Sequence, residues 1–374
     1  MKILNINSYY YSSTVHKQLF QAQLDEEIDA FTYVPVHKKY IQREDCKYGE
    51  ESKVKRAECY NNIDRYVFHI KHAKILKSIV KDIDINYYDC IHAHSLFSNG
   101  YIAMKIKEKF KIPYIVAVRD TDVNTFFKRM PHLRRLGNKI LHEASGVIFL
   151  SIPYRDKVIR EYANYCNKDS LLSKSHIIPN GIDEFWLNNK GTPKTLDFQN
   201  KINLLHVGAV SKRKNILTTI NSIKLLKEKG YDIKLTVVGK IVHEEIYAKI
   251  KKYGYIEYIS PKSKNELLKI YRTNDIFVMP SFTETFGLVY PEAMSQGLPV
   301  LYTMGQGFDG QFEDGEVGYR VDCFNPNELA EKVIQVLERY DNISKKAIEK
   351  SSRFNWKLIV KDYKEIYSNV CNTK

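Results

Sequence analysis

The sequence predicts two doubly wound α/β domains that face each other across a cleft, and three observations support this prediction. The chain has 374 residues, and because a domain holds roughly 150 residues, two domains are expected. In both halves, short β-branched runs alternate with amphipathic runs of helical length, which is typical of βαβ units and a parallel sheet. One segment rich in Pro, Gly and Asn interrupts this alternation near the middle of the chain.

The first predicted domain covers residues 1–180, with helical stretches between most of its strands. Its strands are expected near Lys2–Asn7, Ala30–Val34, Tyr66–Ile70, Asp89–His92, Tyr114–Val118, Gly146–Leu150 and His176–Ile178. The stretch Pro35–Asn62 is charged and aperiodic, so we expect an excursion at the carboxyl edge of the sheet.

The second predicted domain covers residues 201–355 and follows a linker over residues 181–200, where Pro, Gly and Asn break the periodicity. Its strands are expected near Asn203–Val207, Lys234–Val238, Ile256–Ile259, Ile276–Met279, Pro299–Tyr302 and Tyr319–Val321. Residues 356–374 contain a helical stretch that no strand follows. We therefore expect this last helix to pack back on the first domain.

The composition is that of a globular protein, with 44% hydrophobic and 27% charged residues. No apolar run approaches the roughly 20 residues of a membrane span, and the first residues lack a signal-peptide pattern, so a cytoplasmic protein is expected. The six cysteines are scattered, which indicates reduced thiols and neither a zinc site nor a disulfide framework. They are Cys46, Cys59, Cys90, Cys166, Cys323 and Cys371.

The most informative segment is PSFTETFGLVYPEAMSQGLPV, Pro280–Val300, in which a strand leads through a Gly-containing turn into a short helix and another strand. The turn residues Thr285–Leu288 are expected to present free N–H groups to an anion above the strand ends. A diphosphate fits this description. Glu284 precedes the turn and Glu292 follows it on the helix, so the two carboxylates flank the anion site and can each hold hydroxyl groups.

A second segment, HVGAVSKRKNI, also runs from a strand through a turn led by Gly208 into a helix. Arg213 and Lys214 stand where that helix is expected to begin. Cations at a helix start oppose the helix dipole, so we expect an external anion to be their partner. The net charge of +14 agrees with anionic partners, although charge alone does not distinguish a phosphorylated molecule from a membrane surface or nucleic acid.

Together, GAVSKRKN and ETFGLVYPEAMSQGLPV resemble the retaining glycosyltransferases of family 4, which have the GT-B fold of two Rossmann-like domains. Many of these enzymes make bacterial polysaccharide, lipopolysaccharide or teichoic acid. The similarity covers about Ile202–Leu337 and returns as IIPNGID at the end of the first half. It implies metal-independent transfer of a hexose-type sugar from a nucleotide diphosphate donor, with UDP favoured and without a cofactor.

The resemblance also implies roles for individual residues. Glu284 contacts the transferred sugar, Arg213 and Lys214 neutralise the diphosphate, and Glu292 holds the ribose hydroxyls. The other implied donor contacts are Gly208, Phe286, Gly287 and Leu288, with Tyr258 and Ile259 beside the nucleotide base. The donor is thereby assigned to the second domain and the acceptor, a saccharide or a lipid-linked molecule, to the first.

In the first half, Arg119 stands where relatives often carry a sugar-contacting histidine, and Asp122 closes the same motif, so both are candidate acceptor contacts. His94 follows a predicted strand and is a further candidate, with a structural role as the alternative. Asp120-Thr121-Asp122 spells the metal motif of the other glycosyltransferase fold, but that fold has one Rossmann-like domain and leaves the second half unexplained. We therefore expect no metal.

Two other readings receive less support from the sequence. GQGFDG, Gly305–Gly310, spells a dinucleotide fingerprint, but the residues after it do not form a helical pattern, which argues against a dehydrogenase. No nucleic-acid-binding motif is present. Three basic helical stretches in the first half, residues 69–83, 104–112 and 126–140, favour shallow contact with an anionic membrane surface at the inner face of the membrane, although such helices also occur as solvated faces.

The sequence therefore predicts a glycosyltransferase of cell-envelope or polysaccharide synthesis. Alternatives on the same fold are a sugar-nucleotide epimerase and a phosphorylase. A non-catalytic subunit that binds a sugar nucleotide without cleaving it is the alternative from another class.

Overall fold

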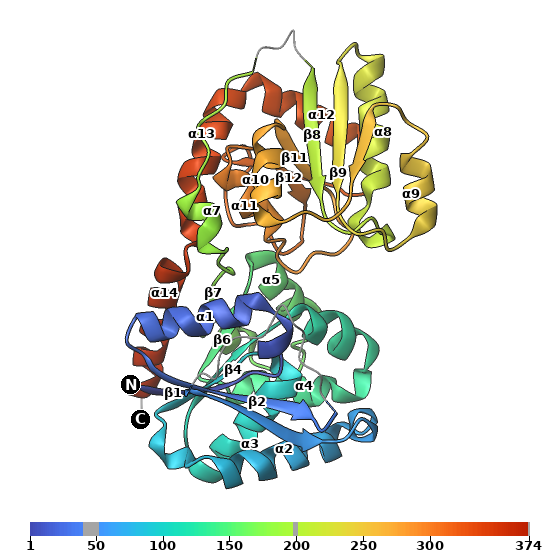
Figure 1. Ribbon diagram of the computed structural model, residues 1–374. Helices are drawn as coiled ribbons and strands as arrows, with labels where there is room; N and C mark the ends of the chain where they lie inside the picture. Colours follow the sequence, from blue (N-terminus) through green and yellow to red (C-terminus); the bar gives the residue numbers. More distant parts are fainter. Residues whose placement is uncertain (40–51, 197–200, 373–374) are drawn as a thin grey trace. The chain divides into compact units, whose positions relative to one another are not determined.

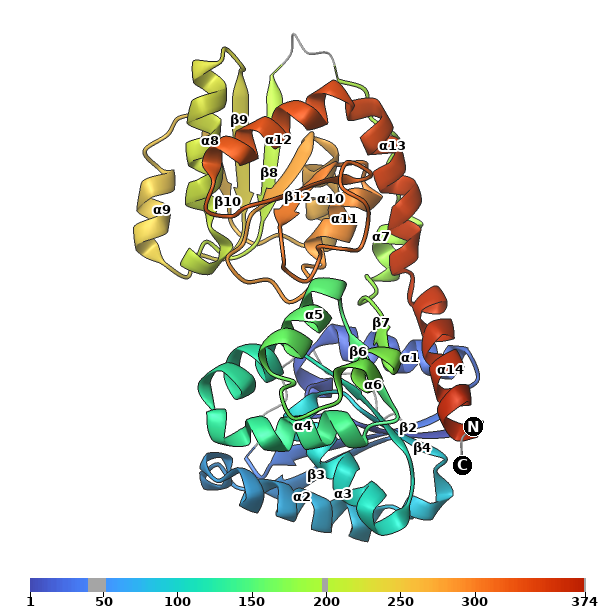
Figure 2. The ribbon, with the colours of Figure 1, turned by 180° about the vertical axis from the view of Figure 1, so that it is seen from behind.

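A computed structural model describes residues 1–39, 52–196 and 201–372. The chain forms two compact units, shown in Figures 1 and 2. Residues 1–150, 154–181 and 356–374 make up the first unit, and residues 151–153 and 182–355 make up the second.

Within the described residues, the first unit contains a seven-stranded sheet in the order β3-β2-β1-β4-β5-β6-β7, and all of its strand pairs are parallel. The strands are β1 (Lys2–Ile6), β2 (Asp29–His37), β3 (Val54–Tyr60), β4 (Cys90–Ala93), β5 (Tyr114–Ala117), β6 (Gly146–Phe149) and β7 (Ser175–Ile177). Its α-helices are α1 (Thr14–Asp25), α2 (Phe68–Asp82), α3 (Tyr101–Phe110), α4 (Arg134–Glu143), α5 (Ile152–Glu161), α6 (Lys168–Ser173) and α14 (Trp356–Asn372).

Helices cover both faces of this sheet, as a parallel sheet requires. The helices α2, α3 and α4 cover one face, while α1 and the C-terminal helix α14 lie side by side on the other (Figure 1). The four-residue strand β4 is buried along its whole length because it lies between two layers. At the start of α14, the Trp356 indole leaves no room for a side chain at Gly181, where a Cβ atom would stand 2.5 Å from the ring.

Two expectations for the first domain are wrong. The excursion Pro35–Asn62 contains β3, which extends the sheet beside β2; its charged residues fit an edge strand, where one side of the ladder stays unpaired. The apolar residues Tyr66–Ile70 form no strand, because α2 begins at Phe68 and buries His72, Ile75 and Ile79 at helical spacing. The part of the excursion from 40 to 51, and Cys46 with it, lies outside the described residues.

The second unit contains, within the described residues, a six-stranded parallel sheet in the order β10-β9-β8-β11-β12-β13. The strands are β8 (Ile202–Val207), β9 (Ile233–Val238), β10 (Ile256–Ile259), β11 (Ile276–Met279), β12 (Val300–Thr303) and β13 (Gly318–Val321). The α-helices are α7 (Glu184–Asn188), α8 (Ile216–Glu228), α9 (Glu244–Ile250), α10 (Lys264–Arg272), α11 (Val289–Ser295), α12 (Pro326–Glu338) and α13 (Tyr340–Ser351).

Figure 2 shows α8 and α12 side by side over one face of this second sheet. The chain order reverses between β8 and β11, because β9 and β10 extend the sheet in one direction and β12 and β13 extend it in the other. Right-handed connections then place successive helices on opposite faces. In such a sheet, ligands bind outside the carboxyl ends of the strands, at the point where the order reverses.

Candidate functional site

The reversal point of the second unit holds a buried ion pair. The Lys214 ammonium contacts the Glu284 carboxylate, and each of these two residues is 8% exposed. Lys214 belongs to a short 3₁₀ turn after β8, and Glu284 to the loop after β11, so two adjacent strands deliver the pair. Burial lowers the pKa of Lys214, and the neighbouring Glu284 carboxylate counters this shift.

Arg213 adds a second cation to the same carboxylate, with its Nη1 3.6 Å from Glu284 Oε2. The same nitrogen donates to the Thr283 carbonyl oxygen at 2.7 Å, while half of the side chain stays exposed. From the sequence, an external anion was expected to be the partner of these cations, because cations at a helix start oppose the helix dipole. In the structure, both cations pair with Glu284. An anion that binds here would therefore share these two cations with Glu284 or displace its carboxylate from them.

The loop after β12 fixes the backbone of Glu284. Its N–H group donates to Gln306 Oε1 at 2.9 Å, and its carbonyl oxygen accepts from the Gly307 N–H group at 3.0 Å. Gly307 approaches so closely that a Cβ atom there would stand 1.7 Å from the Thr285 carbonyl oxygen. The GQGFDG motif therefore positions Glu284, and no helix follows it.

The turn after Glu284 depends on a second glycine. Gly287 has a φ of +80°, and a Cβ atom there would lie 2.4 Å from the Tyr290 ring and 3.1 Å from Glu284 Cγ. The Phe286 side chain is buried against Phe308 and Phe354, so this residue can offer only backbone groups to a ligand. Leu288 comes immediately before α11 and is half-buried.

Glu292 lies on α11 and does not contact Glu284. The Tyr271 hydroxyl donates to Glu292 Oε2 at 3.3 Å. Burial raises the pKa of the Glu292 carboxyl to about 8, although hydrogen bonds from Tyr271 and Trp186 favour its charged form. Because burial disfavours the charged form of Glu292, a ligand that donates hydrogen bonds to this carboxylate would stabilise its charged form.

Three further candidates lie at the carboxyl ends of β8 and β10. Gly208 leaves space for the Lys214 side chain, because a Cβ atom there would meet Lys214 Cε at 3.3 Å. The Tyr258 hydroxyl donates to the Gly239 carbonyl oxygen at 2.9 Å, and the Gly239 N–H donates to the Ile259 carbonyl oxygen at 3.1 Å. These contacts join the ends of β9 and β10.

In the first unit, the structure brings His94, Arg119 and Asp122 together at the ends of β4 and β5. Arg119 Nε donates to the His94 carbonyl oxygen at 3.4 Å, and the Arg119 backbone N–H donates to Asp122 Oδ2 at 2.9 Å. The Asp122 carboxylate is 1% exposed and also accepts from the backbone N–H groups of Leu96 and Phe97 at 2.9 and 3.0 Å. Burial raises the pKa of Asp122 to about 6. Asp122 thus holds the turn after β4.

His94 is fully enclosed by other rings and polar groups. Its ring stacks on His92 at 3.9 Å, and its Nε2 lies 3.1 Å from Asn5 Oδ1. Burial, with smaller contributions from His92, His16 and Arg119, holds the pKa of His94 well below its usual range. This neutral, 2% exposed ring is oriented by its neighbours, whereas Arg119 is partly exposed.

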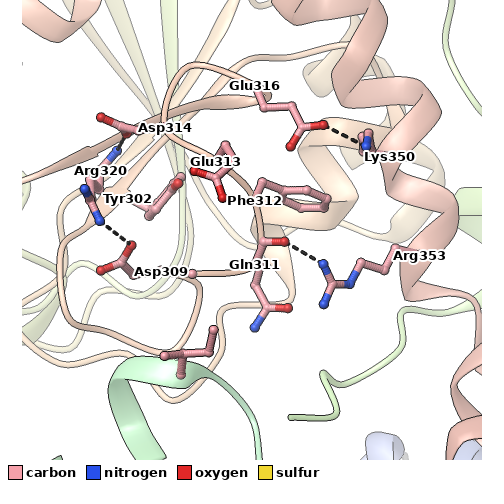
Figure 3. A pocket seen from close by; sticks show the side chains of 12 residues that line it. Tyr302, Asp309, Gln311, Phe312, Glu313, Asp314, Glu316, Arg320, Lys350 and Arg353 are labelled. Carbon is pink, nitrogen blue, oxygen red and sulfur yellow. Dashed lines mark hydrogen bonds and ion pairs between the residues drawn. The ribbon is translucent and has the colours of Figure 1, made fainter. Parts of the chain in front are cut away.

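A separate cavity of about 580 Å³ lies beside the loop after β12 (Figure 3). Its charged walls include the Glu316–Lys350 pair at 2.7 Å and Arg320, whose Nη1 lies 3.9 Å from Asp309 Oδ1. Arg353 lies over the Phe312 ring, 5.6 Å from its centre, and donates to the Gln311 carbonyl oxygen. This loop is the one that also holds Glu284.

Sequence reasoning missed the residues that fix the loops. Asn215 adopts the left-handed conformation at φ +53°, and its Nδ2 donates to the carbonyl oxygens of Pro280 and Cys323 at 2.9 and 2.7 Å. In the sequence, Gln306 and Gly307 stand out only as part of GQGFDG, which spells a dinucleotide fingerprint but is not followed by a helical pattern. An asparagine between a basic turn and a helix is a signal for the left-handed conformation, but its distant partners are not visible in the sequence.

The described residues form neither a cluster suited to a metal ion nor a helix suited to crossing a membrane. Among residues 1–39, 52–196 and 201–372, no three His, Cys, Asp or Glu side chains are grouped so that they could hold a metal ion. Both Asp122 oxygens accept backbone N–H groups, and Asp120 Oδ1 accepts from Tyr154 and Asn124 at 2.7 and 2.6 Å. None of the five cysteines in the described part forms a disulfide. No helix in that part has the length and apolar character needed to cross a membrane.

Two family models match consecutive parts of the chain. Residues 190–354 match the glycosyl transferases group 1 model, and residues 40–184 match the glycosyltransferase family 4 model. An uncharacterized glycosyltransferase of Methanocaldococcus jannaschii is 27% identical over 310 residues, which are 79% of each chain.

Solved structures show the same fold across the whole chain. Sucrose-phosphate synthase from Thermosynechococcus elongatus has a TM-score of 0.75 at 18% identity and covers 100% of both chains. Anabaena HepE in complex with UDP has a TM-score of 0.73 at 17% identity, over 99% of this chain and 100% of its own. The two family models, the sequence relative and the shared GT-B architecture together identify the chain as a glycosyltransferase of family 4.

Proposed function

We propose that this glycosyltransferase is a retaining, metal-independent enzyme that transfers a hexose from a UDP-sugar to a saccharide or lipid-linked acceptor. The observation that carries the proposal is the junction of Arg213, Lys214 and Glu284 at the reversal point of the second sheet. Two cations there can neutralise a diphosphate leaving group, which is the task of a divalent ion in metal-dependent enzymes.

Glu284 supplies the complementary charge. As the bond from sugar to diphosphate lengthens, positive charge grows at the anomeric carbon, and a carboxylate fixed beside it stabilises the transition state. The backbone contacts with Gln306 and Gly307 hold this carboxylate in place. In the proposed complex, Arg213 and Lys214 contact the diphosphate, and the Glu284 carboxylate contacts the sugar.

The choice of a UDP-sugar rests on a neighbour and on the chemistry of the site. HepE was crystallised with UDP, and Tyr258, Ile259 and Glu292 occupy the positions that the resemblance assigns to base and ribose. We assign the acceptor to the first unit, near Arg119. A role in polysaccharide or cell-envelope synthesis remains part of the proposal.

The test is turnover of UDP-glucose with and without a chelator. Release of UDP should depend on an acceptor and continue in EDTA. Activity that EDTA abolishes and manganese restores would overturn metal independence. An epimerase would release nucleotide and an altered sugar without any acceptor, a phosphorylase would require inorganic phosphate, and a binding subunit would hold UDP-glucose intact.

Membrane contact is proposed for the start of α2. Four large apolar side chains in the 3₁₀ turn Ile63–Tyr66 and at the start of α2 are exposed, at 80% for Ile63, 90% for Tyr66, 47% for Val67 and 49% for Ile70. The exposed Lys77 lies further along the same helix, whereas Lys105 and Lys139 of the other two basic stretches both pair with Glu108. We expect binding to anionic vesicles that weakens with salt. Equal binding to neutral vesicles would contradict this.

A further inference from the structure

The segment 181–200, which the sequence presents as a linker, contains the helix α7, and this helix packs within the second unit. It lies beside α11, the helix that carries Glu292 (Figures 1 and 2). Trp186 of α7 is 1% exposed and is among the largest fully buried side chains of the described residues. The segment therefore does more than connect two domains.

The helix α7 is fixed to α10 near both of its ends. Before α7, Asp183 Oδ1 accepts the Phe185 N–H at 3.0 Å, and the other carboxylate oxygen of Asp183 contacts the Lys264 ammonium at the start of α10. After α7, the Asn189 carbonyl oxygen accepts from Arg272 Nη2, at the end of α10, at 2.9 Å. These contacts hold the side chains of α7 in a constant position relative to those of α10.

One buried side chain from each of these helices donates to Glu292. The Tyr271 hydroxyl of α10 donates to Glu292 Oε2 at 3.3 Å, and the Trp186 indole N–H donates to the same carboxylate. The Trp186 and Tyr271 rings meet edge to face, with centres 5.4 Å apart and planes at 88°. Lys264, whose charge also acts on Glu292, is paired with Asp183. Two neutral donors therefore hold this carboxylate.

This arrangement leaves the Glu292 carboxylate able to accept further hydrogen bonds. A carboxylate has about four acceptor positions, so the donors of Tyr271 and Trp186 leave about two, and Glu292 is only half-buried. The two neighbouring hydroxyls of a ribose supply that number of donors. If the carboxylate turned away, two buried donors would lose their partner, which is costly, so they resist such a rotation.

We propose that Tyr271 and Trp186 are positioning residues, which hold the Glu292 carboxylate where it accepts hydrogen bonds from the ribose hydroxyls of the donor. This inference rests on the proposed function, because it requires a nucleotide donor whose ribose lies at Glu292. It makes α7 a part of the donor site, although the sequence presents its residues as a linker. Losing either donor should then reduce the ability of the site to distinguish ribose from deoxyribose.

The test compares dissociation constants for UDP, 2′-deoxy-UDP and 3′-deoxy-UDP, measured by isothermal titration calorimetry. Because a hydroxyl that donates to a carboxylate is lost, the wild-type protein should bind at least one analogue about ten- to a hundredfold more weakly than UDP. Tyr271→Phe and Trp186→Phe each remove one donor and keep an aromatic ring. Each should lower this preference for UDP about fivefold, as the loss of one hydrogen bond implies.

Tyr340→Phe is the matched control, because it also removes a buried hydroxyl from the second unit. Tyr340 is 2% exposed and donates to the Asp275 carbonyl oxygen at 3.0 Å, so the preference for UDP should stay at the wild-type value. Glu292→Ala should abolish the preference. Adding Tyr271→Phe to Glu292→Ala should then change it no further, because Tyr271 acts through Glu292.

Three results would overturn the inference. The first is that Tyr271→Phe and Trp186→Phe weaken the binding of UDP and of both analogues equally, as a merely structural role would. The second is that Tyr340→Phe lowers the preference as much as they do, and the third is that the wild-type protein binds both analogues as tightly as UDP. If one variant does not fold, the other decides. A wild-type protein that does not bind UDP would instead count against the proposed function.

Discussion

At the scale of the single residue, Glu284 and Glu292 differ in their surroundings, although both flank the same turn in the sequence. Glu284 contacts two cations, while Glu292 has hydroxyl and indole partners and a pKa raised to about 8 by burial. A carboxylate among cations suits a site where charge changes during the reaction. A carboxyl among neutral donors suits a hydroxyl-binding site, where charge stays constant.

We therefore expect Glu284→Gln and Glu292→Gln to affect different kinetic constants. Glu284→Gln keeps the shape but removes the charge that stabilises the transition state, so turnover should fall about 100- to 1,000-fold, with donor affinity changed only a few-fold. Glu292→Gln should mainly weaken donor binding. Steady-state kinetics and UDP titration of both variants provide the measurement. Near-wild-type turnover in both would show that the glutamates only support the turn.

At the scale of the element, the loop after β12 links several features that look unrelated in the sequence. Gln306 and Gly307 hold the Glu284 backbone, and Asp309 accepts the Gly305 N–H at 2.7 Å, which closes the loop on itself. The loop continues into the wall of the cavity in Figure 3. A movement of this loop would therefore reach Glu284 through its backbone.

This arrangement predicts that Gly307→Ala lowers turnover and also costs stability, because the atoms that the new methyl group meets belong to the backbone. The new methyl group would overlap the Thr285 carbonyl oxygen, so the loop must shift and Glu284 moves with it. A small misplacement of a catalytic group can cost about 100-fold in rate. The matched control is Gly254→Ala, where a Cβ atom would meet nothing within 4 Å. Equal turnover in the two variants would contradict a positioning role for this loop.

The loops also show where prediction from the sequence succeeds and where it ends. Strands such as β8 and β11 are recognisable because a buried parallel strand is a short apolar run, and the turns after them carry Lys214 and Glu284. That these two side chains form a pair depends on the adjacency of two strands about 70 positions apart in the chain, which no local pattern encodes. The strand predicted at Tyr66–Ile70 was wrong for another reason. Tyr66, Val67 and Ile70 are apolar but exposed, so this apolar run does not mark a buried strand.

At the scale of the whole molecule, the two units differ in how they bury titratable groups. The first unit buries four histidines, with the pKa of His16 lowered to about 3, that of His72 to about 4, and those of His92 and His94 held well below the usual range. Desolvation is the main cause in each case. The second unit has one such buried histidine, His206, whose pKa is lowered to about 3. It also has Glu292, whose pKa is raised to about 8.

These groups predict that mild acid unfolds the first unit before the second. Below about pH 6.5, the unfolded chain protonates its histidines, whereas the folded unit keeps four of them neutral, so its stability falls as pH falls. Asp122 works against this trend, because its raised pKa lets the folded state take up a proton between about 6 and 3.8. Because the four histidines outnumber this one carboxyl, the net stability of the first unit falls as the pH falls below about 6.5.

In the second unit, the contributions of His206 and Glu292 have opposite signs and cancel between about pH 4.5 and 6.5. The two native tryptophans allow each unit to be observed separately, since Trp356 belongs to the first and Trp186 to the second. Single-tryptophan variants, Trp186→Phe and Trp356→Phe, melted from pH 7 to pH 5, should show a steep fall in the midpoint of the first unit and a much smaller change in the second. Replacing His92 by Gln should make the melting midpoint of the first unit fall less steeply with falling pH. Midpoints that fall in parallel would show that the buried histidines do not set the acid limit of the protein.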